Sequence, residues 1–401
     1  MSFSGNASKK KKILFVMNNL HTGGAEKALV SLLQEFDFDR YEVDLFLFQH
    51  AGMFLKQVPQ EVRILPEPVD YRFFDQPVSA SIKNLLLTFR PLLAWRRLKF
   101  GLIMRSKRSS SMKEQRAWKL LSATLPKLSG YDVAIGYLQR SPIYFCVDNV
   151  SAAKKLGFIH NDYKQLAMDA SADKRYLQQL DTIFSVSESC VDILKEEFPD
   201  LTAKIKLMYN VISPNNLFRL AEEPLSLHKK ALTLVSVGRL HPQKGFDMAV
   251  EACKVLVDKG CDVVWYILGE GAERAALEQR IADYHLEQHF VLCGIKENPY
   301  PYIKAADIYV QPSRFEGKSI AIDEAKVLGK PIIVTDFPSV RDQIQHLQTG
   351  YIVPFEAAKL ADAIMHVAGD KQVQDKFRVN LHTECSGIKN QLQVLDDAID
   401  K

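Results

Sequence analysis

The sequence has few cysteines and no pair of them at metal-binding spacing. Six occur among 401 residues, and none belongs to a CxxC arrangement. A disulfide framework or a structural zinc site needs paired thiols, so neither is expected. Mostly apolar surroundings predict reduced, buried thiols in a cytosolic protein, at Cys146, Cys190, Cys253, Cys261, Cys293 and Cys385.

Long apolar runs are absent as well. No stretch approaches the ~20 apolar residues that a membrane-spanning helix requires. The lysines at 9–12 and the apolar residues at 13–17 imitate a signal peptide, but the apolar part is too short and is ended by Asn18 and Asn19. We therefore expect a flexible, solvated tail over residues 1–12 that leads into a first buried strand.

The composition shows no strong bias. The formal net charge is +4, hydrophobic residues make up 47% and charged residues 25%, and there are 19 glycines and 17 prolines. These values argue against disordered, collagen-like or low-complexity chains, and so small a charge does not indicate a nucleic-acid partner. At about 150 residues per domain, the length predicts two to three domains.

Short apolar runs alternate with helical patterns along most of the chain. Predicted strands fall at 13–17, 43–48, 62–65, 133–137, 156–159, 182–186 and 206–209, and a second series at 232–237, 263–268, 290–293, 308–310, 332–335 and 351–353. Predicted helices include 25–35, 112–125, 188–197, 246–259, 272–284, 319–328 and 357–368. This alternation is typical of α/β folds whose parallel sheets are covered on both faces.

A break near residues 213–230 divides the two series. Its prolines, asparagines and glutamates resemble a linker, and a strand, a glycine loop and a helix follow. We predict two doubly wound, Rossmann-like domains at 13–212 and 213–385, and a helix at 386–401 that packs back on the first domain. Since ligands bind beyond the carboxyl ends of such strands, two facing domains would share one cleft.

Two glycine loops follow predicted strand ends. Gly23 and Gly24 stand between a strand and a helix, where the backbone can approach a phosphate, although a tight turn explains them equally well. After the first strand of the second series come Gly238, Arg239 and Lys244. A guanidinium fork and an ammonium at a helix start suit a diphosphate, whereas either cation alone would be a solvated surface charge.

Two glutamates stand eight residues apart around a predicted helix start. Glu316 precedes the helix and Glu324 lies about two turns along it. If all eight steps were helical, the carboxylates would be ~12 Å apart, beyond the ~5–9.5 Å of a glycosidase pair. The spacing suits two hydroxyl-rich groups on either side of a diphosphate. Taken singly, each glutamate is more often a solvated helix charge.

Taken in order, these motifs resemble those of the family 4 retaining glycosyltransferases of the GT-B fold. The resemblance rests on Gly23-Gly24, on His160 in GFIHN, on Gly238-Arg239 with Lys244-Gly245, and above all on Glu316 and Glu324 as the E-x7-E motif within SRFEGKSIAIDEA. Further matches lie at 268–271 and 294–309. The resemblance covers residues 13 to about 367, except 79–127.

The resemblance implies a role for each motif. Arg239 and Lys244 would hold the donor diphosphate, Glu324 the nucleotide ribose, and Glu316 and His160 the donor sugar. The implied catalytic set is Glu316, His160, Arg239 and Lys244. The implied donor-binding set is Gly23, Gly24, Gly238, Arg239, Lys244, Gly294, Gly317, Lys318, Ser319 and Glu324. The first domain would face the acceptor and the second would bind the nucleotide sugar.

The chemistry follows from this arrangement. Negative charge develops on the diphosphate as the sugar C1–O bond breaks, and Arg239, Lys244 and helix N–H groups would stabilise it. In the resembled family the departing phosphate accepts the acceptor proton on the same face, which implies no protein nucleophile, no metal and no cofactor. His160 alone would more often be structural, but its place after a strand end favours sugar contact. The stretch Lys318-Ser319-Ile320 is more polar than the same stretch in many members of the resembled family, which often contains proline. This difference leaves the identity of the sugar open.

Three further patterns are better explained by turns. Asp37-Phe38-Asp39 matches a metal-binding DxD motif but lies away from the ligand edge, where a turn role is expected. Gly317-Lys318-Ser319 imitates the end of a P-loop, but Pro312 stands where that motif needs glycine. Gly269-Glu270-Gly271 is only a fragment of a dinucleotide fingerprint, so we assign it a turn role.

A basic segment at 90–119 contains ten basic residues and one acidic residue, a net charge of +9 in a chain of +4. Leucines and Trp95 interleave with the charges, as on helices that bind anionic bilayers. A solvated, partly mobile excursion explains the pattern about as well. The predicted membrane contacts are Arg96, Arg97, Lys99, Arg105, Lys107 and Arg108.

These observations together predict a cytoplasmic or inner-membrane-peripheral hexosyltransferase. It would transfer the sugar of a nucleotide diphosphate sugar, for which we expect UDP as the nucleotide. The acceptor would be a lipid-linked saccharide or a polysaccharide in surface glycan synthesis. One alternative is a GT-B sugar-nucleotide epimerase, which would not need the basic excursion. Another is a non-catalytic nucleotide-sugar or nucleic-acid binding module, but RNA-binding motifs are missing.

Overall fold

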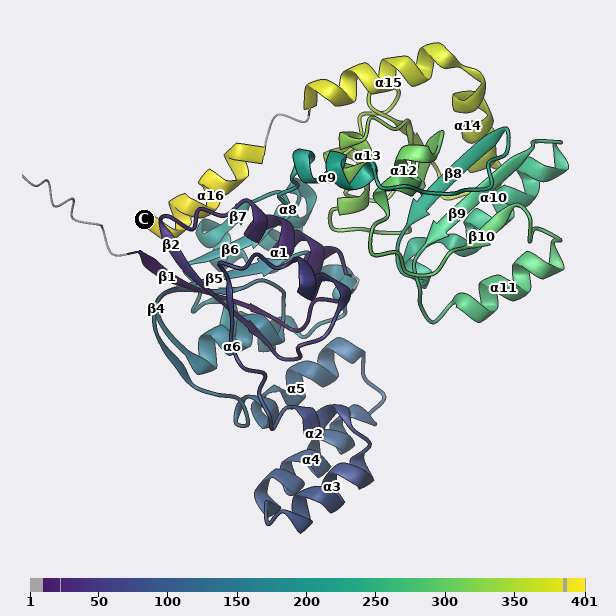
Figure 1. The fold of residues 1–401 in the computed structure, drawn as a ribbon. Coiled ribbons are helices and arrows are strands. Elements are labelled where there is room, and N and C mark those ends of the chain that lie inside the picture. The colour runs from purple at the N-terminus through teal and green to yellow at the C-terminus, as the bar shows by residue number, and fades with distance from the viewer. Residues whose placement is uncertain (1–9, 22, 385–387, 401) are drawn as a thin grey trace, which may run out of the picture.

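The computed structural model describes residues 10–21, 23–384 and 388–400. Two α/β units lie side by side, each built on a parallel sheet with helices on both faces (Figure 1). The predicted fold class is confirmed. The exact domain boundaries stay a prediction.

The first sheet has the strand order β3-β2-β1-β4-β5-β6-β7, and all its pairings are parallel. Alternate residues of its central strand enter two hydrophobic clusters, Phe15 on one face and Val16 on the other. The strands are β1 (Lys11–Met17), β2 (Tyr41–Leu47), β3 (Arg63–Ile64), β4 (Leu128–Gly136), β5 (Val150–Ile159), β6 (Thr182–Ser185) and β7 (Ile205–Leu207). Because β1 begins at Lys11, the prediction that residues 11 and 12 belong to a flexible tail is wrong; residues 1–9 lie outside the described residues.

The second sheet has the strand order β10-β9-β8-β11-β12-β13, again all parallel. Its strands are β8 (Leu232–Val237), β9 (Val263–Leu268), β10 (Phe290–Leu292), β11 (Ile308–Gln311), β12 (Ile332–Thr335) and β13 (Tyr351–Val353). Four of these, β8, β9, β12 and β13, match the predicted ranges at both ends, because apolar residues predominate in each.

Helices connect the strands and cover both sheets (Figure 1). The helices up to the end of the first unit are α1 (Gly24–Gln34), α2 (Arg72–Asp75), α3 (Val78–Leu87), α4 (Pro91–Met104), α5 (Ser110–Ser122), α6 (Ser141–Asn149), α7 (Ala170–Leu177) and α8 (Glu188–Glu197). The later helices are α9 (Pro214–Ala221), α10 (Phe246–Asp258), α11 (Arg274–Asp283), α12 (Tyr300–Ala305), α13 (Ile320–Val327), α14 (Ala357–Gly369), α15 (Lys371–Glu384) and α16 (Ile388–Asp400).

The segment expected to be a linker is partly helical. Helix α9 begins after Ser213 and is fastened to the second unit by Asn298, whose side-chain amide donates to the Leu220 carbonyl at 2.7 Å. At the other end of the chain, α16 returns to the first sheet. Its Leu395 and Ile399 are buried, and the Lys11 ammonium lies 2.7 Å from the Asp400 carboxylate.

The basic segment forms folded helices rather than a mobile loop. Helices α2 to α5 make an excursion that stands off the first sheet, away from the second unit (Figure 1). Arg97 is only 4% exposed, and its guanidinium donates to the carbonyls of Phe73 at 2.7 Å and Gln76 at 2.6 Å. The prediction that Arg97 contacts a membrane is therefore wrong, because its charge is used inside the excursion.

The cysteines and the DxD pattern have structural explanations. Among the described residues, Cys146, Cys190 and Cys253 are buried free thiols, whereas Cys261 and Cys293 are half-buried; Cys385 lies outside the described residues. The Asp37 carboxylate accepts the backbone N–H groups of residues 39 and 40 at 3.0 and 3.3 Å, so its predicted turn role is confirmed. Within residues 10–21, 23–384 and 388–400, no helix has the length and apolarity needed to cross a bilayer.

Candidate active site

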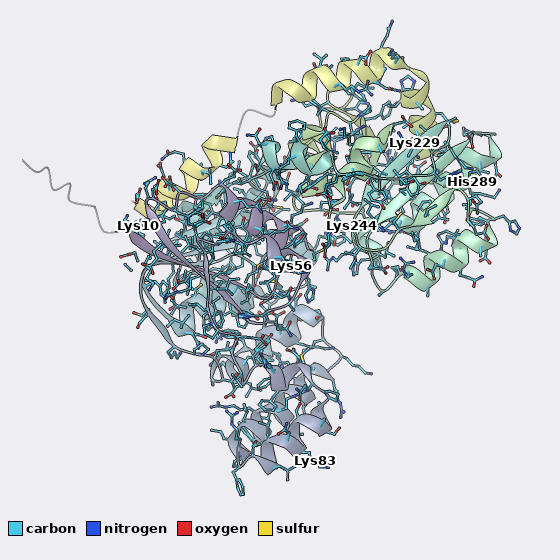
Figure 2. The ribbon with its side chains drawn as sticks, viewed as in Figure 1. Lys10, Lys56, Lys83, Lys229, Lys244 and His289 are labelled. Atoms are coloured by element: carbon cyan, nitrogen blue, oxygen red, sulfur yellow. The ribbon has the colours of Figure 1, made fainter. Side chains whose placement is uncertain are left out.

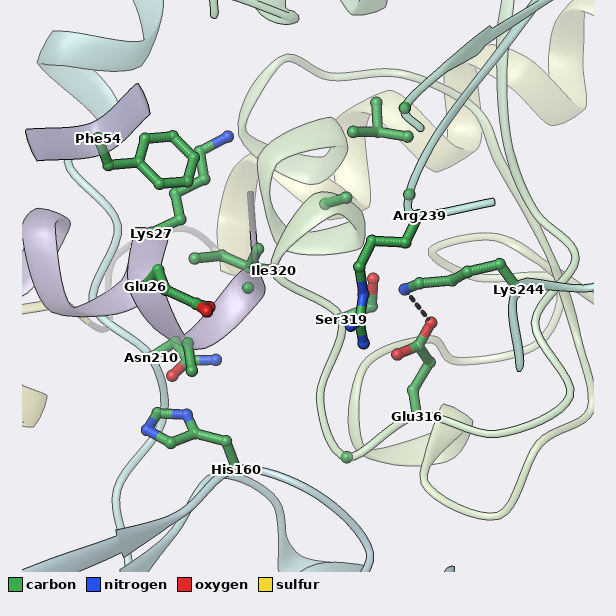
Figure 3. Close-up of a pocket in the computed structure, with 18 of the residues that line it drawn as sticks. Glu26, Lys27, Phe54, His160, Asn210, Arg239, Lys244, Glu316, Ser319 and Ile320 are labelled. Carbon is green, nitrogen blue, oxygen red and sulfur yellow. Dashed lines mark hydrogen bonds and ion pairs between the residues drawn. The ribbon is translucent and has the colours of Figure 1, made fainter. Parts of the chain in front are cut away.

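A cavity of about 400 Å³ lies between the two units at the carboxyl ends of their central strands. Loops after β1, β2, β4, β5 and β7 form one wall, and loops after β8, β9, β10 and β11 form the other. Figure 2 shows Lys244 between the units, and Figure 3 shows the side chains that face each other across the cavity. This is the shared cleft that two facing parallel sheets predict.

The structure brings nearly all the predicted donor-site residues to this cavity. Those that line it are Gly23, Gly24, His160, Gly238, Arg239, Lys244, Glu316, Gly317, Lys318, Ser319 and Glu324. Gly294 itself does not line it, but Ile295, Lys296 and Glu297 directly after it do, and its role in donor binding stays a prediction. The Gly294 carbonyl instead accepts from the Gly269 N–H at 2.9 Å, and its φ of +73° suits a glycine, so it shapes the rim.

Lys244 and Glu316 form an ion pair in the wall of the second unit. The Lys244 ammonium lies 2.5 Å from Glu316 Oε1, which also accepts from the Ser313 hydroxyl at 2.6 Å. Glu316 is 7% exposed. Gly238 matters here because a Cβ at its position would stand 3.1 Å from the lysine stem. The glycine therefore lets Lys244 lie across the end of β8.

Arg239 extends into the cavity beside this pair (Figure 3). Its side chain is exposed and, among the described residues, has no hydrogen bond or ion pair. Across the cavity lies Glu26, in the first turn of α1. Burial raises the pKa of Glu26, although the charge of Arg239 acts to lower it. The cavity therefore offers a cation that is free to meet an anion.

Glu324 is held by a contact that crosses between the units. Its Oε1 accepts from the Lys27 ammonium at 2.6 Å and from the Tyr300 hydroxyl at 3.0 Å. Burial alone would lower the pKa of Lys27, but the charge of the Glu324 carboxylate raises it above the ordinary lysine value. Glu324 Oε2 is buried and has no hydrogen-bond partner among the described residues. One oxygen is thus fixed and the other is available to a hydroxyl.

His160 faces the cavity as a neutral imidazole. Its ring is 7% exposed and lies 4.9 Å from the ring of Tyr137 and 5.7 Å from that of Phe158. Burial lowers the pKa of His160 to about 4. Its Nε2 is buried and finds no partner in the described part of the chain. A neutral ring nitrogen with an open hydrogen bond suits a sugar hydroxyl.

Sequence reasoning missed several cavity residues. Glu26 and Lys27 lie two and three residues after the Gly-Gly turn, and Asn210 follows β7, but each resembles an ordinary polar residue near an element boundary. Gly269 and Glu270, for which the sequence predicts only a turn, both line the cavity. Their position directly after β9 places them at the same sheet edge as Arg239, and this position could have predicted that they line the cavity.

The predicted membrane-contact residues lie apart from the cavity, on the excursion. Lys99, Arg105, Lys107 and Arg108 are exposed, whereas Arg96 is half-buried and donates to the Ala123 carbonyl at 3.1 Å.

Comparisons with known proteins agree with this architecture. Residues 219–382 match the family model described as Glycosyl transferases group 1. The amylovoran biosynthesis glycosyltransferase AmsK of Erwinia amylovora is 32% identical over 165 residues, which are 37% of this chain and 40% of that protein. The UDP-Gal:alpha-D-GlcNAc-diphosphoundecaprenol alpha-1,3-galactosyltransferase of Escherichia coli is 29% identical over 156 residues, 38% of this chain and 40% of that one.

A solved structure extends the similarity to the whole chain. TarM of S. aureus, crystallised with Fondaparinux, alpha-GlcNAc-glycerol and UDP, superposes with a TM-score of 0.69 at 15% identity, covering 98% of this chain and 100% of that one. The matched segments span about two fifths of the two curated relatives' length. Residues 219–382 thus match the group 1 glycosyltransferase model and the chain has the GT-B fold, in agreement with the resemblance drawn from its motifs.

Proposed function

We propose that this chain is a retaining glycosyltransferase that moves a hexose from a UDP-sugar to a lipid-linked or polysaccharide acceptor in cell-surface glycan synthesis. The observation that carries the proposal is the convergence of Arg239, Lys244, Glu316 and Glu324 on one cavity. The relatives named above include proteins of amylovoran synthesis and of lipid-linked galactosyl transfer, which supports the acceptor class.

The donor would lie along the wall of the second unit. Arg239 and Lys244 would bind the diphosphate, and Glu324 Oε2 would accept a hydrogen bond from a ribose hydroxyl. The sugar would then extend toward Glu316 and His160. In the structure Glu316 binds Lys244 at 2.5 Å. Donor binding would therefore weaken this ion pair, so that Lys244 binds the phosphate and Glu316 binds the sugar.

Transfer would proceed by charge stabilisation rather than through a protein nucleophile. The sugar C1–O bond to the diphosphate breaks, and the acceptor oxygen bonds to C1 on the same face. Its proton passes to the departing phosphate. Arg239, Lys244 and the free N–H groups at the start of α13 stabilise the growing negative charge. On the opposite wall, Glu26 and Asn210 could orient the acceptor hydroxyl.

A product analysis tests this proposal. The chain is incubated with each of several nucleotide diphosphate sugars, with and without a lipid-linked acceptor, and the product's anomeric configuration is determined by NMR. We expect acceptor-dependent transfer with retention, and activity that persists in a chelator. Sugar-nucleotide isomerisation without acceptor would indicate an epimerase, and binding without turnover would indicate a non-catalytic module.

A further inference from the structure

Helix α4 exposes a second apolar face on the excursion. Leu92 is 61% exposed, Trp95 49%, Leu98 47% and Leu102 60%. Their spacing places them on one side of the helix, and we call them the outer stripe of α4. The opposite side is already buried, with Leu93 at 6% exposure among its residues. The outer stripe is therefore not needed to hold α4 in the fold.

The turn between α3 and α4 extends this apolar surface. Phe89 is 93% exposed, and Leu86 and Leu87 beside it are 55% and 70% exposed. The Phe89 N–H donates to the Leu86 carbonyl at 3.2 Å and the Arg90 N–H to the Leu85 carbonyl at 2.8 Å, the two bonds of a Schellman motif.

Phe89 occupies the position in this motif where glycine is preferred. Its φ is +55°, a left-handed conformation that is uncommon for a bulky side chain. The ring gains almost no packing within the chain in return, because it is 93% exposed. A strained residue that presents an aromatic ring to the outside indicates a contact with something outside the chain.

The excursion that carries the apolar surface also carries exposed positive charge. Lys83, Lys99, Arg105, Lys107 and Arg108 are exposed on the excursion, and within the described residues none of them has an ion-pair partner. Figure 2 places Lys83 at the end of the excursion that lies far from the cavity.

The combination of charge and apolar side chains fits an anionic phospholipid surface. The Lys99 ammonium lies 3.9 Å from the centre of the Trp95 ring, a cation–π contact that places a positive charge directly beside the exposed aromatic side chain. Lysine and tryptophan side chains both favour the boundary between headgroups and acyl chains.

The excursion is also fastened to the cavity wall. Glu114 of α5 lies 2.8 Å from the Arg140 guanidinium and accepts from the Ser141 hydroxyl at 2.5 Å. Arg140 lines the cavity between the two units. A surface bound by α3 and α4 would therefore be held at a fixed distance from the cavity.

We infer that the α3–α4 turn and the outer stripe of α4 insert into the headgroup region of an anionic phospholipid membrane, and that the exposed lysines and arginines of the excursion bind its phosphates. Docking in this way would bring a lipid-linked acceptor to the first unit's side of the cavity. That last step rests on the proposed function, whereas the docking itself does not.

The test is sedimentation of the full chain with vesicles of phosphatidylcholine, with or without phosphatidylglycerol, at low and high salt. We expect binding to the anionic vesicles at low salt that weakens at high salt. Trp95→Gln should lower the partition coefficient at least fivefold. Phe218→Gln is the matched control, because Phe218 on α9 is equally 49% exposed but lies outside the excursion.

Two further variants separate binding from folding. Phe89→Gly relieves the left-handed strain, so it should leave the protein as stable or more stable while weakening vesicle binding. Lys107→Gln with Arg108→Gln should weaken binding about fivefold per charge at low salt. Transfer to a water-soluble acceptor should be unchanged in all of these variants. A lack of transfer in the wild type would refute the proposed function and leave the sedimentation result to decide docking.

Three results would overturn the inference. The first is no binding to anionic vesicles at low salt. The second is equal loss of binding in Trp95→Gln and Phe218→Gln. The third is self-association without lipid that Trp95→Gln abolishes, because the surface would then be an interface between copies of the chain.

Discussion

Replacing Lys244 by methionine separates its structural role from its proposed binding role. In the structure, its ammonium lies 2.5 Å from Glu316 Oε1, and the two side chains are 16% and 7% exposed. Removing one partner of a buried pair costs about 3–5 kcal/mol. Because Glu316 keeps its hydrogen bond from Ser313 at 2.6 Å, we expect a loss near the lower end, about 3 kcal/mol of unfolding free energy.

The same variant should bind UDP more weakly. A charge-assisted hydrogen bond is worth about 1.5–3 kcal/mol, so the dissociation constant should rise about 10- to 150-fold. Glu316→Gln alone should instead leave UDP affinity equal or increased, because it frees Lys244 from its carboxylate. In the double variant Lys244→Met with Glu316→Gln, stability should largely return, since no unpaired charge stays buried, whereas UDP affinity should not.

Denaturant titration and calorimetric titration with UDP on the same preparations measure both effects. If Lys244→Met loses stability but binds UDP as tightly as the wild type, the lysine is only a structural partner of Glu316. The assignment of the diphosphate site to this part of the cavity would then be refuted.

Four further changes test other parts of the structure. Glu316→Gln should lower kcat about 10- to 100-fold in a transfer assay, because a charged contact to the sugar becomes neutral. Lys27→Met should destabilise the fold by about 3 kcal/mol and weaken UDP binding, since Glu324 is 2% exposed and would keep only the Tyr300 hydroxyl. The pKa of His160 in the folded protein, about 4, lies below the ordinary 6.5. Folding stability from this group is therefore complete above pH 6.5, and the free energy of unfolding should fall by about 2 kcal/mol between pH 7 and pH 5. His160→Gln should remove that pH dependence in denaturant titrations. Arg97→Met should cost about 2 kcal/mol, because the buried side chain loses its hydrogen bonds to the Phe73 and Gln76 carbonyls, while vesicle binding per folded molecule stays unchanged.

Each of these has a result that would contradict it. Wild-type turnover in Glu316→Gln would remove that residue from the sugar site. Unchanged stability in Lys27→Met would mean that the contact between the units carries no energy. A pH dependence that persists in His160→Gln would arise from other groups. Weaker vesicle binding in stable Arg97→Met would restore Arg97 to the membrane surface.

The amino-acid sequence determined the fold class and most of the cavity. Strands such as Val263–Leu268 and Ile332–Thr335 are predominantly apolar runs between polar or turn residues, so burial on both faces of a sheet fixes their limits. Parallel strands all place their carboxyl ends at one edge. Motifs that directly follow strands, such as Arg239 and Glu316, therefore had to arrive at that edge.

Only the tertiary structure decided which charges meet. Lys27 and Glu324 are almost three hundred residues apart and pair at 2.6 Å because two separate units bring α1 against α13. Helix α4 is apolar on both sides, so its sequence could not show that Arg97 faces inward and Trp95 outward. The spacing of residues along the chain predicts which side of a helix is polar. It does not predict the partner of a charged side chain, because that partner depends on how the two units pack together.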